Sequence, residues 1–132
     1  MKKPQDNEYV AYCLELLSSL GPCNARSMFG GYGIYLDGLM FALIAADRLY
    51  LKADADSEAQ WRSAAGEPFV YQSPKGPMAM SYWTPPQEAM DSPAQMAPWA
   101  RLGLEAALRA RAAKPAKKSA VKRAAPRSKS KS

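Results

Sequence analysis

Three glycines lie within four positions of this chain, at Gly30, Gly31 and Gly33, between large apolar and aromatic residues. A phosphate-binding glycine loop would lead directly into a helix, but the next residues, 34–36, are Ile-Tyr-Leu and favour a pleated strand. The spacing also differs from the GxGxxG pattern of dinucleotide sites. Asp37-Gly38 follows, a strong hairpin signal because glycine adopts positive φ freely. The glycines therefore predict a bend or bulge in a β-sheet.

The hydrophobic pattern changes its period along the first half of the chain. Residues 7–20 carry an apolar stripe at three- and four-residue spacing, which predicts a helix that Gly21-Pro22 would end. Beyond it, short links between apolar segments predict antiparallel strands. These strands are expected at residues 25–29, 32–36, 39–45 and 48–52. The strand at 39–45 is apolar on both faces, which indicates a central strand covered by a helix.

The second half of the chain continues this mixed pattern. A short helix is expected over residues 57–65, capped by Ser57, ended by Gly66 and carrying Trp61 on its apolar side. Strands at 69–71 and 78–83 are expected to flank a turn at 74–77, which is rich in proline and glycine. A last helix is expected from Pro98, because proline is tolerated at the first helical position. These elements predict an α+β fold, a single small domain with a mainly antiparallel sheet flanked by helices.

Charge divides the chain into two parts. Residues 1–108 contain eight basic and all twelve acidic residues, a net charge of −4, whereas residues 109–132 contain ten basic residues and no acidic one. From residue 112 the composition is restricted to Ala, Lys, Arg, Pro, Ser and one Val. Such a segment buries almost no apolar surface and repels itself, so we expect it to be disordered. The expected organisation is a folded domain over residues 1–112 and a basic tail over residues 113–132.

The basic tail is the strongest physical signal for a partner. Its cations are separated by small residues and prolines, so they stay accessible to phosphates, whose neutralisation releases counterions. The tail has no aromatic residue to stack on bases and no Asn or Gln to read base edges, so nucleic-acid binding without sequence preference is expected. A solvated appendage and a weak anionic-membrane contact are the alternatives. The predicted nucleic-acid-binding residues are Lys114, Lys117, Lys118, Lys122, Arg123, Arg127, Lys129 and Lys131.

The residues that usually carry chemistry are scarce. The sequence contains no histidine and two cysteines, too few ligands for a zinc site and none for imidazole-based catalysis. We therefore expect no enzyme, no catalytic residue, no cofactor and no metal. Cys13 lies in a helical apolar pattern and is expected to be buried, while a disulfide to Cys23 would require the chain to turn back closely.

No targeting or membrane-spanning segment is evident. The N-terminal residues lead into no apolar run of the signal-peptide type. No stretch reaches the ~18 apolar residues that a membrane span requires. On these grounds the protein is expected to be cytoplasmic, with no membrane partner.

Four short motifs follow one another along the chain. They contain Arg26, Met28, Phe29, Gly30, Gly31 and Gly33, then Tyr50 and Lys52, then Phe69 and Tyr71, and finally Met80, Tyr82 and Trp83. Together they resemble the TfoX (Sxy) N-terminal domain family over residues 7–110. The resemblance implies a small α+β domain with an antiparallel sheet, similar to secretion-chaperone-like folds. It also implies a regulator of competence genes that acts with a transcription activator at promoters.

Several of these residues have two interpretations. Arg26 either presents its guanidinium to a carboxylate or phosphate ligand, or pairs with Asp37, Asp47 or another acid at the edge of the core. Met28 and Phe29 are expected in the core. The aromatic cluster formed by Phe69, Tyr71, Tyr82 and Trp83 either covers the sheet or forms an exposed interface.

The function expected from this sequence is that of a non-enzymatic regulatory or accessory protein. Its domain would contact a protein partner such as a transcription activator, and its tail would add non-specific affinity for nucleic acid. One alternative is a small ligand-binding or enzymatic domain with its site beside Arg26. The other is a chaperone-like homodimer that uses its exposed sheet.

Overall fold

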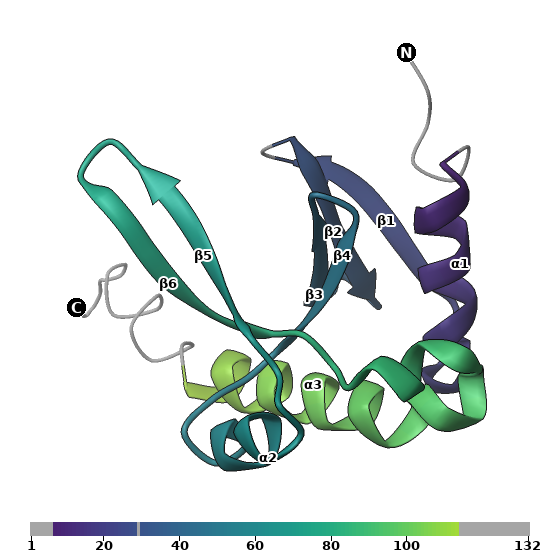
Figure 1. Cartoon of the computed structure of the whole chain (residues 1–132). Coiled ribbons are helices and arrows are strands. Elements are labelled where there is room, and N and C mark those ends of the chain that lie inside the picture. Colours follow the sequence, from purple (N-terminus) through teal and green to yellow (C-terminus); the bar gives the residue numbers. More distant parts are fainter. Residues whose placement is uncertain (1–6, 29, 114–132) are drawn as a thin grey trace, which may run out of the picture.

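The computed structural model describes residues 7–28 and 30–113. The described chain forms one six-stranded antiparallel sheet in the order β1-β2-β3-β4-β6-β5, with helices packed against it, which confirms the predicted α+β fold (Figure 1). The elements, in chain order, are α1 (Glu8–Leu16), η2 (Ser18–Leu20), β1 (Cys23–Met28), β2 (Gly31–Leu36), β3 (Leu39–Ala45), β4 (Arg48–Lys52), α2 (Glu58–Ser63), β5 (Pro68–Ser73), β6 (Gly76–Trp83), η3 (Gln87–Asp91) and α3 (Pro93–Ala113), where η denotes a 3₁₀-helix.

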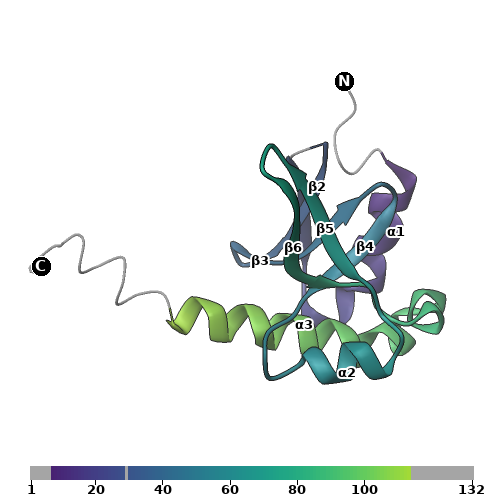
Figure 2. The same cartoon turned by 60° about the vertical axis from the view of Figure 1, so that its left-hand side comes forward.

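The sheet has two arms that meet at a narrow junction. Strands β1 to β4 form a meander, and β5 and β6 form a separate hairpin. The hairpin joins β4 through two residue pairs, Leu51 with Trp83 and Lys52 with Tyr82. Figure 1 shows the β5–β6 hairpin leaning away from β1–β4, so that the arms diverge above α3. The view in Figure 2 shows α2 and α3 together beneath the sheet.

The core lies between the sheet and the helices. Leu16 of α1, Ile34 of β2, Leu51 of β4 and Met96 of α3 are completely buried there. Helix α3 approaches β4 closely because Gly103 has no side chain: a Cβ at this position would lie 3.2 Å from Leu51 Cβ. This packing covers one face of the sheet and leaves the other face open.

Two tight hairpins organise the meander. Asp37 and Gly38 have φ of 51° and 80°, and Leu36 pairs with Leu39, so the predicted hairpin turn is confirmed. The next turn, Ala46-Asp47, also uses positive φ at both positions, 52° and 59°, without a glycine.

Of the bend or bulge predicted at the glycines, the bend is present, because Gly30 has a φ of 77° and lies in the turn between β1 and β2. The bulge lies further along the chain. Gly31 and Gly33 pair regularly with β1. The register shifts where Ile34 pairs with Ala42 and Tyr35 pairs with Met40, which leaves Phe41 as the extra residue. Phe41 and Ala42 are both completely buried, so the bulge turns two successive side chains into the core.

Two helix boundaries differ from the prediction. The first α-helix ends at Leu16 and continues as the 3₁₀-helix η2 up to Leu20. The last helix begins at Pro93 and contains Pro98, and the short η3 before it was not predicted. Ser92 explains the earlier start, because its hydroxyl accepts a hydrogen bond from the Gln95 backbone N–H at 3.2 Å. Ser92 thus occupies the capping position and Pro93 the first helical position, where proline costs little.

The ends of α2 also differ from expectation. Ser57 precedes α2, but its hydroxyl donates to Asp54 Oδ1 at 3.0 Å instead of capping the helix. At the other end Ala65, not Gly66, has positive φ. Gly66 is needed for a different reason, since a Cβ there would lie 2.6 Å from the Thr84 carbonyl oxygen. Trp61 is completely buried, as predicted.

Candidate functional site

The open face of the sheet, hereafter the outer face, carries most of the motif residues. Cross-strand partners share a face, so Arg26, Gly33, Leu43 and Tyr50 form one row across β1 to β4. Lys52 pairs with Tyr82 and extends this face onto the second arm. The residues that sequence reasoning grouped by family resemblance are therefore brought together on one surface.

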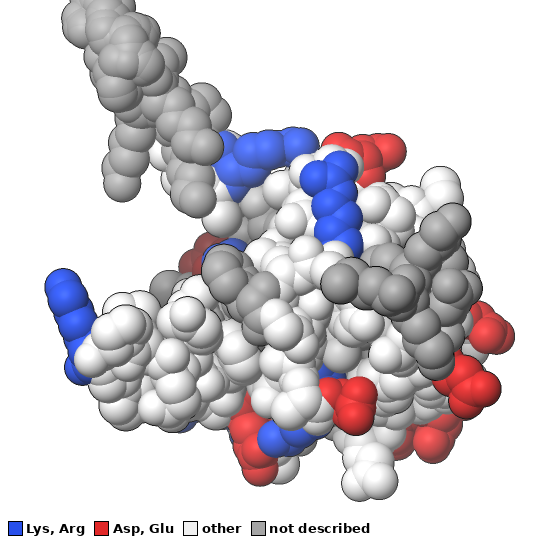
Figure 3. Space-filling model, turned by 90° about the horizontal axis from the view of Figure 1, so that it is seen from above, with Lys and Arg blue, Asp and Glu red and all other residues white. Residues whose placement is uncertain are grey.

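A groove of about 440 Å³ runs along the outer face between the two arms. Its lining contains no charged residue, and Met78 and Met80 in it are exposed by 50% and 38%. Figure 3 looks down on the molecule from above, and most of the described surface in view is uncharged and drawn in white. The four methionines of the groove are Met28 on β1, Met40 on β3, and Met78 and Met80 on β6.

A small second core lies beneath this groove. Leu43, Tyr50 and Tyr82 are buried there, and the rings of Tyr50 and Phe69 are 5.0 Å apart between centroids. The predicted aromatic cluster is consequently divided between two faces. Phe69 and Tyr82 belong to the outer face, whereas Trp83 packs into the main core. Tyr71 lines the groove and is 39% exposed.

Three cations border the groove, each placed over a tyrosine ring. The distances from the charged group to the ring centroid are 4.9 Å for Arg26 over Tyr35, 5.7 Å for Arg48 over Tyr50, and 5.1 Å for Lys52 over Tyr82. Such cation–π contacts hold the charge near the apolar surface, and the guanidinium of Arg48 also pairs with Glu67 at 3.0 Å. The six strands contain these three cations and no Asp or Glu. The outer face is therefore apolar in its centre and positively charged at its border.

This geometry argues against one of the two proposed roles of Arg26, the ion pair with an acid at the edge of the core. Within residues 7–28 and 30–113, no ion pair joins its guanidinium to Asp37 or Asp47. The side chain is exposed and lies over Tyr35 instead. The expected pairing with an acid at the edge of the core is thus replaced by a cation–π contact.

The prediction that Met28 lies in the core is wrong. Strand alternation places Met28 on the same face as Arg26, where it lines the groove and is partly exposed. Phe29, the other expected core residue, lies outside the described residues, as do all the predicted nucleic-acid-binding residues from Lys114 to Lys131.

The motif glycines Gly31 and Gly33 are explained by what surrounds them. A Cβ on Gly31 would overlap the carbonyl oxygen of Ile44 on β3, so a side chain there would separate two strands. A Cβ on Gly33 would lie 2.6 Å from Met28 Sδ and 3.2 Å from Met40 Sδ. Gly33 therefore leaves room for two of the groove methionines.

Sequence reasoning did not recognise that Met40, Met78 and Met80 line a groove. The signal was present in β6, where Met78, Met80 and Tyr82 alternate with smaller residues and so share one face. Their role could not be recognised because nothing in the sequence showed which face of this strand the helices leave open.

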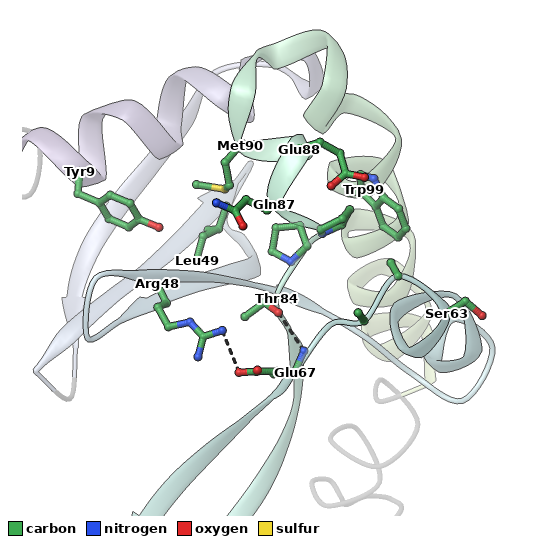
Figure 4. Close-up of a pocket in the computed structure, with 14 residues that line it drawn as sticks. Tyr9, Arg48, Leu49, Ser63, Glu67, Thr84, Gln87, Glu88, Met90 and Trp99 are labelled. Atoms are coloured by element: carbon green, nitrogen blue, oxygen red, sulfur yellow. Dashed lines mark hydrogen bonds and ion pairs between the residues drawn. The ribbon is translucent and has the colours of Figure 1, made fainter.

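A second, more polar cleft of about 710 Å³ lies on the other side of β4, next to α1 and η3 (Figure 4). Arg48 pairs with Glu67 across it at 3.0 Å, and both side chains are well exposed. The Thr84 hydroxyl accepts the Glu67 backbone N–H at 2.9 Å. Burial, with the nearby Cys13 thiol, raises the pKa of Tyr9 to about 12, so its hydroxyl stays protonated at neutral pH. Among the charged residues that line this cleft, Arg48 and Glu67 are thus paired with each other.

The cysteines lack the features of a reactive site. Burial raises the pKa of Cys13 to about 12, which keeps its thiol protonated. Cys13 and Cys23 are both free, and the disulfide that would have required the chain to turn back closely is not formed. Within the described residues, no cluster of three His, Cys, Asp or Glu side chains could hold a metal ion. No described helix is long and apolar enough to cross a bilayer.

The fold and the placement of the motifs agree with a known family. The family model of the TfoX N-terminal domain matches residues 15–107. The chain belongs to the TfoX N-terminal domain family. It is also similar to the DNA transformation protein TfoX1 of Aliivibrio fischeri, with 34% identity over 55 residues. That match covers 42% of this chain and 26%, about a quarter, of the length of the relative. The name of this relative connects it with DNA transformation.

Proposed function

We propose that this TfoX-family chain is a non-enzymatic regulatory protein that acts in transcription through protein contacts made by the outer face. The observation that carries the proposal is the position of the motif residues. Arg26, Met28, Gly33 and Tyr50 share the face that the helices leave uncovered, and Lys52 and Tyr82 continue it. A motif that served only the core would be directed towards α1 and α3.

The exposed apolar surface supports a macromolecular partner. Leaving Met78 and Met80 in water forfeits hydrophobic free energy, at roughly 25 cal/mol for each Å² of apolar surface. Apolar patches on monomeric proteins mark interaction sites when they are contiguous and have a polar border. The groove meets both conditions, since its uncharged lining is bordered by Arg26, Arg48 and Lys52.

The basic segment 113–132 would add a second, independent affinity. Its eight cations would bind nucleic acid without sequence preference and hold the protein near DNA while the domain contacts its partner. The support for this part is the composition of the segment alone. The two activities are separable because they reside in different parts of the chain.

A transcription reporter tests the role of the outer face. A competence-gene promoter fused to a reporter is measured in a bacterium that lacks its own TfoX-family regulator and expresses either the full chain or a variant. The variant Met78→Asp/Met80→Asp places two charges in the groove at partly exposed positions. The control Leu108→Asp introduces a charge at a residue of α3 that is 40% exposed.

We expect the groove variant to lose activation and the Leu108→Asp control to retain it, with both proteins folded by circular dichroism. Full activation by the groove variant would overturn the proposal. A pull-down repeated after nuclease treatment separates the contacts further: a partner retained without nucleic acid is held by the domain.

A further inference from the structure

We propose that the groove of the outer face binds an amphipathic helix that carries acidic side chains beside its apolar face. This inference rests on the proposed function, because it takes the partner to be a protein, and it specifies the chemistry of that partner. It is carried by three features of the outer face: the methionine lining, the border of cations, and the position of the groove on the face of the sheet.

The lining of the groove is suited to a row of apolar side chains. Met28, Met40, Met78 and Met80 surround it, and the unbranched, polarisable methionine side chain adapts to irregular partner surfaces. A volume of about 440 Å³ accommodates several side chains but not a whole helix. A helix lying across the groove would insert residues spaced at i, i+3 or i+4, and i+7, the pattern of helix-in-groove recognition.

The charges of the outer face select an acidic partner. Arg26, Arg48 and Lys52 all lie on this face, and no strand contributes an acid. The acidic residues of the described chain lie in helices, turns and loops, as in Glu8 of α1 and Asp37 of the first hairpin turn. Glu67 already pairs with Arg48, so Arg26 is the cation that carries this selection, and an acidic flank on a bound helix would face no acid from the strands.

The position of the groove favours a helix over an extended peptide. An extended peptide joins a sheet by hydrogen bonding along an exposed edge, and here the edges are β1 and β5. The groove instead lies on the face between the two arms and is lined by side chains of β1, β2, β3, β5 and β6. Strands β4 and β6 pair at Leu51–Trp83 and Lys52–Tyr82, and their facing backbone edges diverge above this junction (Figure 1). Side-chain insertion is the mode of binding that this surface offers.

Two other occupants fit the same surface less well. A second copy bound face to face would oppose its own Arg26, Arg48 and Lys52 to those of the first copy, which is unfavourable. A nucleic-acid strand would supply anions, but Tyr50 and Tyr82 are 7% and 9% exposed, which leaves base stacking to more exposed rings at the groove such as Tyr71, at 39%. Both occupants are tested as outcomes of the experiment below.

The test uses NMR of the full chain labelled with ¹³C at its methionine methyl groups. The probes are two designed amphipathic peptides of about five helical turns. Both carry leucine along one face, and the opposite face carries glutamate in one peptide and lysine in the other. Met28, Met40, Met78 and Met80 report on the groove, whereas Met90 and Met96 lie on the helical side of the sheet and serve as internal controls.

We expect the glutamate peptide to shift the four groove signals and leave Met90 and Met96 unchanged, and the lysine peptide to bind at least about tenfold more weakly. Arg26→Glu should weaken binding of the glutamate peptide by about fivefold or more, since it replaces an attractive charge with a repulsive one. Arg26→Lys should retain most of the affinity. The matched control Arg101→Glu makes the same change in net charge at an exposed residue of α3 and should leave the affinity nearly unchanged.

Several results would overturn the inference. One such result is that the glutamate peptide leaves the NMR signals of the four groove methionines unshifted, even if the peptide binds the basic tail. Equal binding of the two peptides would exclude charge selection. If a single-stranded oligonucleotide shifts the NMR signals of the groove methionines more than the glutamate peptide does, the outer face binds nucleic acid. If dilution of the protein alone shifts these signals, the outer face binds a second copy of the chain. If Met78→Asp/Met80→Asp still abolishes the reporter signal in such a case, the proposed function stands and this inference alone fails.

Discussion

Arg109 on α3 donates two hydrogen bonds to the carboxylate of Asp54, fifty-five positions earlier in the chain. The Nε–Oδ2 distance is 2.7 Å and the Nη2–Oδ1 distance is 3.0 Å. Asp54 also accepts a hydrogen bond from the Ser57 hydroxyl at 3.0 Å, so the loop before α2 is tied to the distal part of α3. The distribution of charged residues along the sequence placed Arg109 in the basic stretch 109–132. Its contacts with Asp54 show instead that it belongs to the folded domain.

The first prediction concerns the acid sensitivity of this pair. The hydrogen bonds from Arg109, followed by those from Ser57, lower the pKa of Asp54 below its usual value, which is about 3.9 in an unfolded chain. A lowered folded-state pKa means that the stabilisation is fully present above the unfolded pKa and is lost as the pH falls through the folded pKa. Asp54→Asn should therefore be less stable than the parent at pH 7, by an amount that shrinks below about pH 4.

Urea unfolding of the parent and of Asp54→Asn between pH 7 and pH 2 measures this difference. Arg109→Gln serves as the partner variant, and the double variant should lose little more than either single one. A stability difference that grew on acidification would contradict the assigned pairing.

The second prediction compares the loss of stability caused by alanine at two motif glycines, Gly31 and Gly33. Gly31→Ala should destabilise the domain by about 2 kcal/mol or more, because the new Cβ meets the backbone carbonyl of Ile44, which cannot move without disturbing β3. Gly33→Ala meets the flexible ends of Met28 and Met40 and should cost less than about 1 kcal/mol. Chemical denaturation gives both values, and methyl NMR should show Met28 and Met40 displaced in Gly33→Ala. Equal destabilisation by the two substitutions would mean that the face lacks the described register.

The third prediction is that substitutions in the two hairpin turns change the stability of the domain in opposite directions. Gly38→Val should destabilise the domain by about 1 kcal/mol or more, since a β-branched residue resists the φ of 80° at this position. Ala46→Gly should instead stabilise it by about 0.5 kcal/mol, because relief of the left-handed conformation outweighs the added entropy of the unfolded chain. Thermal melting measures both changes. An unchanged Tm for Gly38→Val would place the first hairpin elsewhere.

The sequence predicted the parts of the fold that depend on local signals. Asp37-Gly38 identified a hairpin, and the change from helical to alternating periodicity located the strands. The start of α3 could not be assigned as securely, because both Pro93 and Pro98 suit a first helical position and the choice depends on the Ser92 cap. The outer face was harder still to predict. It depends on the junction of β4 with β6, a long-range pairing of four residues that leaves no local pattern.

The same distinction applies to the candidate site. The resemblance to TfoX proteins selected residues that share the outer face, but it did not reveal that they surround a groove. Met28 was assigned to the core because an apolar residue in a strand suits either face, and only the position of the helices decides between them. Arg26 was assigned an acidic partner because charge is visible in a sequence, whereas its contact with Tyr35 depends on cross-strand register.

The last prediction concerns the boundary after α3. Ending the chain after Ala113 removes residues whose apolar content is limited to alanine, proline and Val121, and it retains the Arg109–Asp54 pair. The Tm should therefore remain nearly unchanged, because little apolar surface is lost. Residues 1–113 contain ten basic and twelve acidic residues, a net charge of −2, so most binding to random duplex DNA at low salt should disappear.

Fluorescence anisotropy with two unrelated duplexes measures this binding. The full chain should bind both duplexes about equally, and its affinity should fall steeply as salt rises, because each phosphate contact releases counterions. Tight DNA binding by the shortened chain, or a preference of the full chain for one sequence, would transfer nucleic-acid recognition to the folded domain. Arg26, Arg48 and Lys52 would then be the first residues to replace, since the outer face holds all three. Arg62 would be a weaker candidate because it lies on α2, not on the outer face of the sheet.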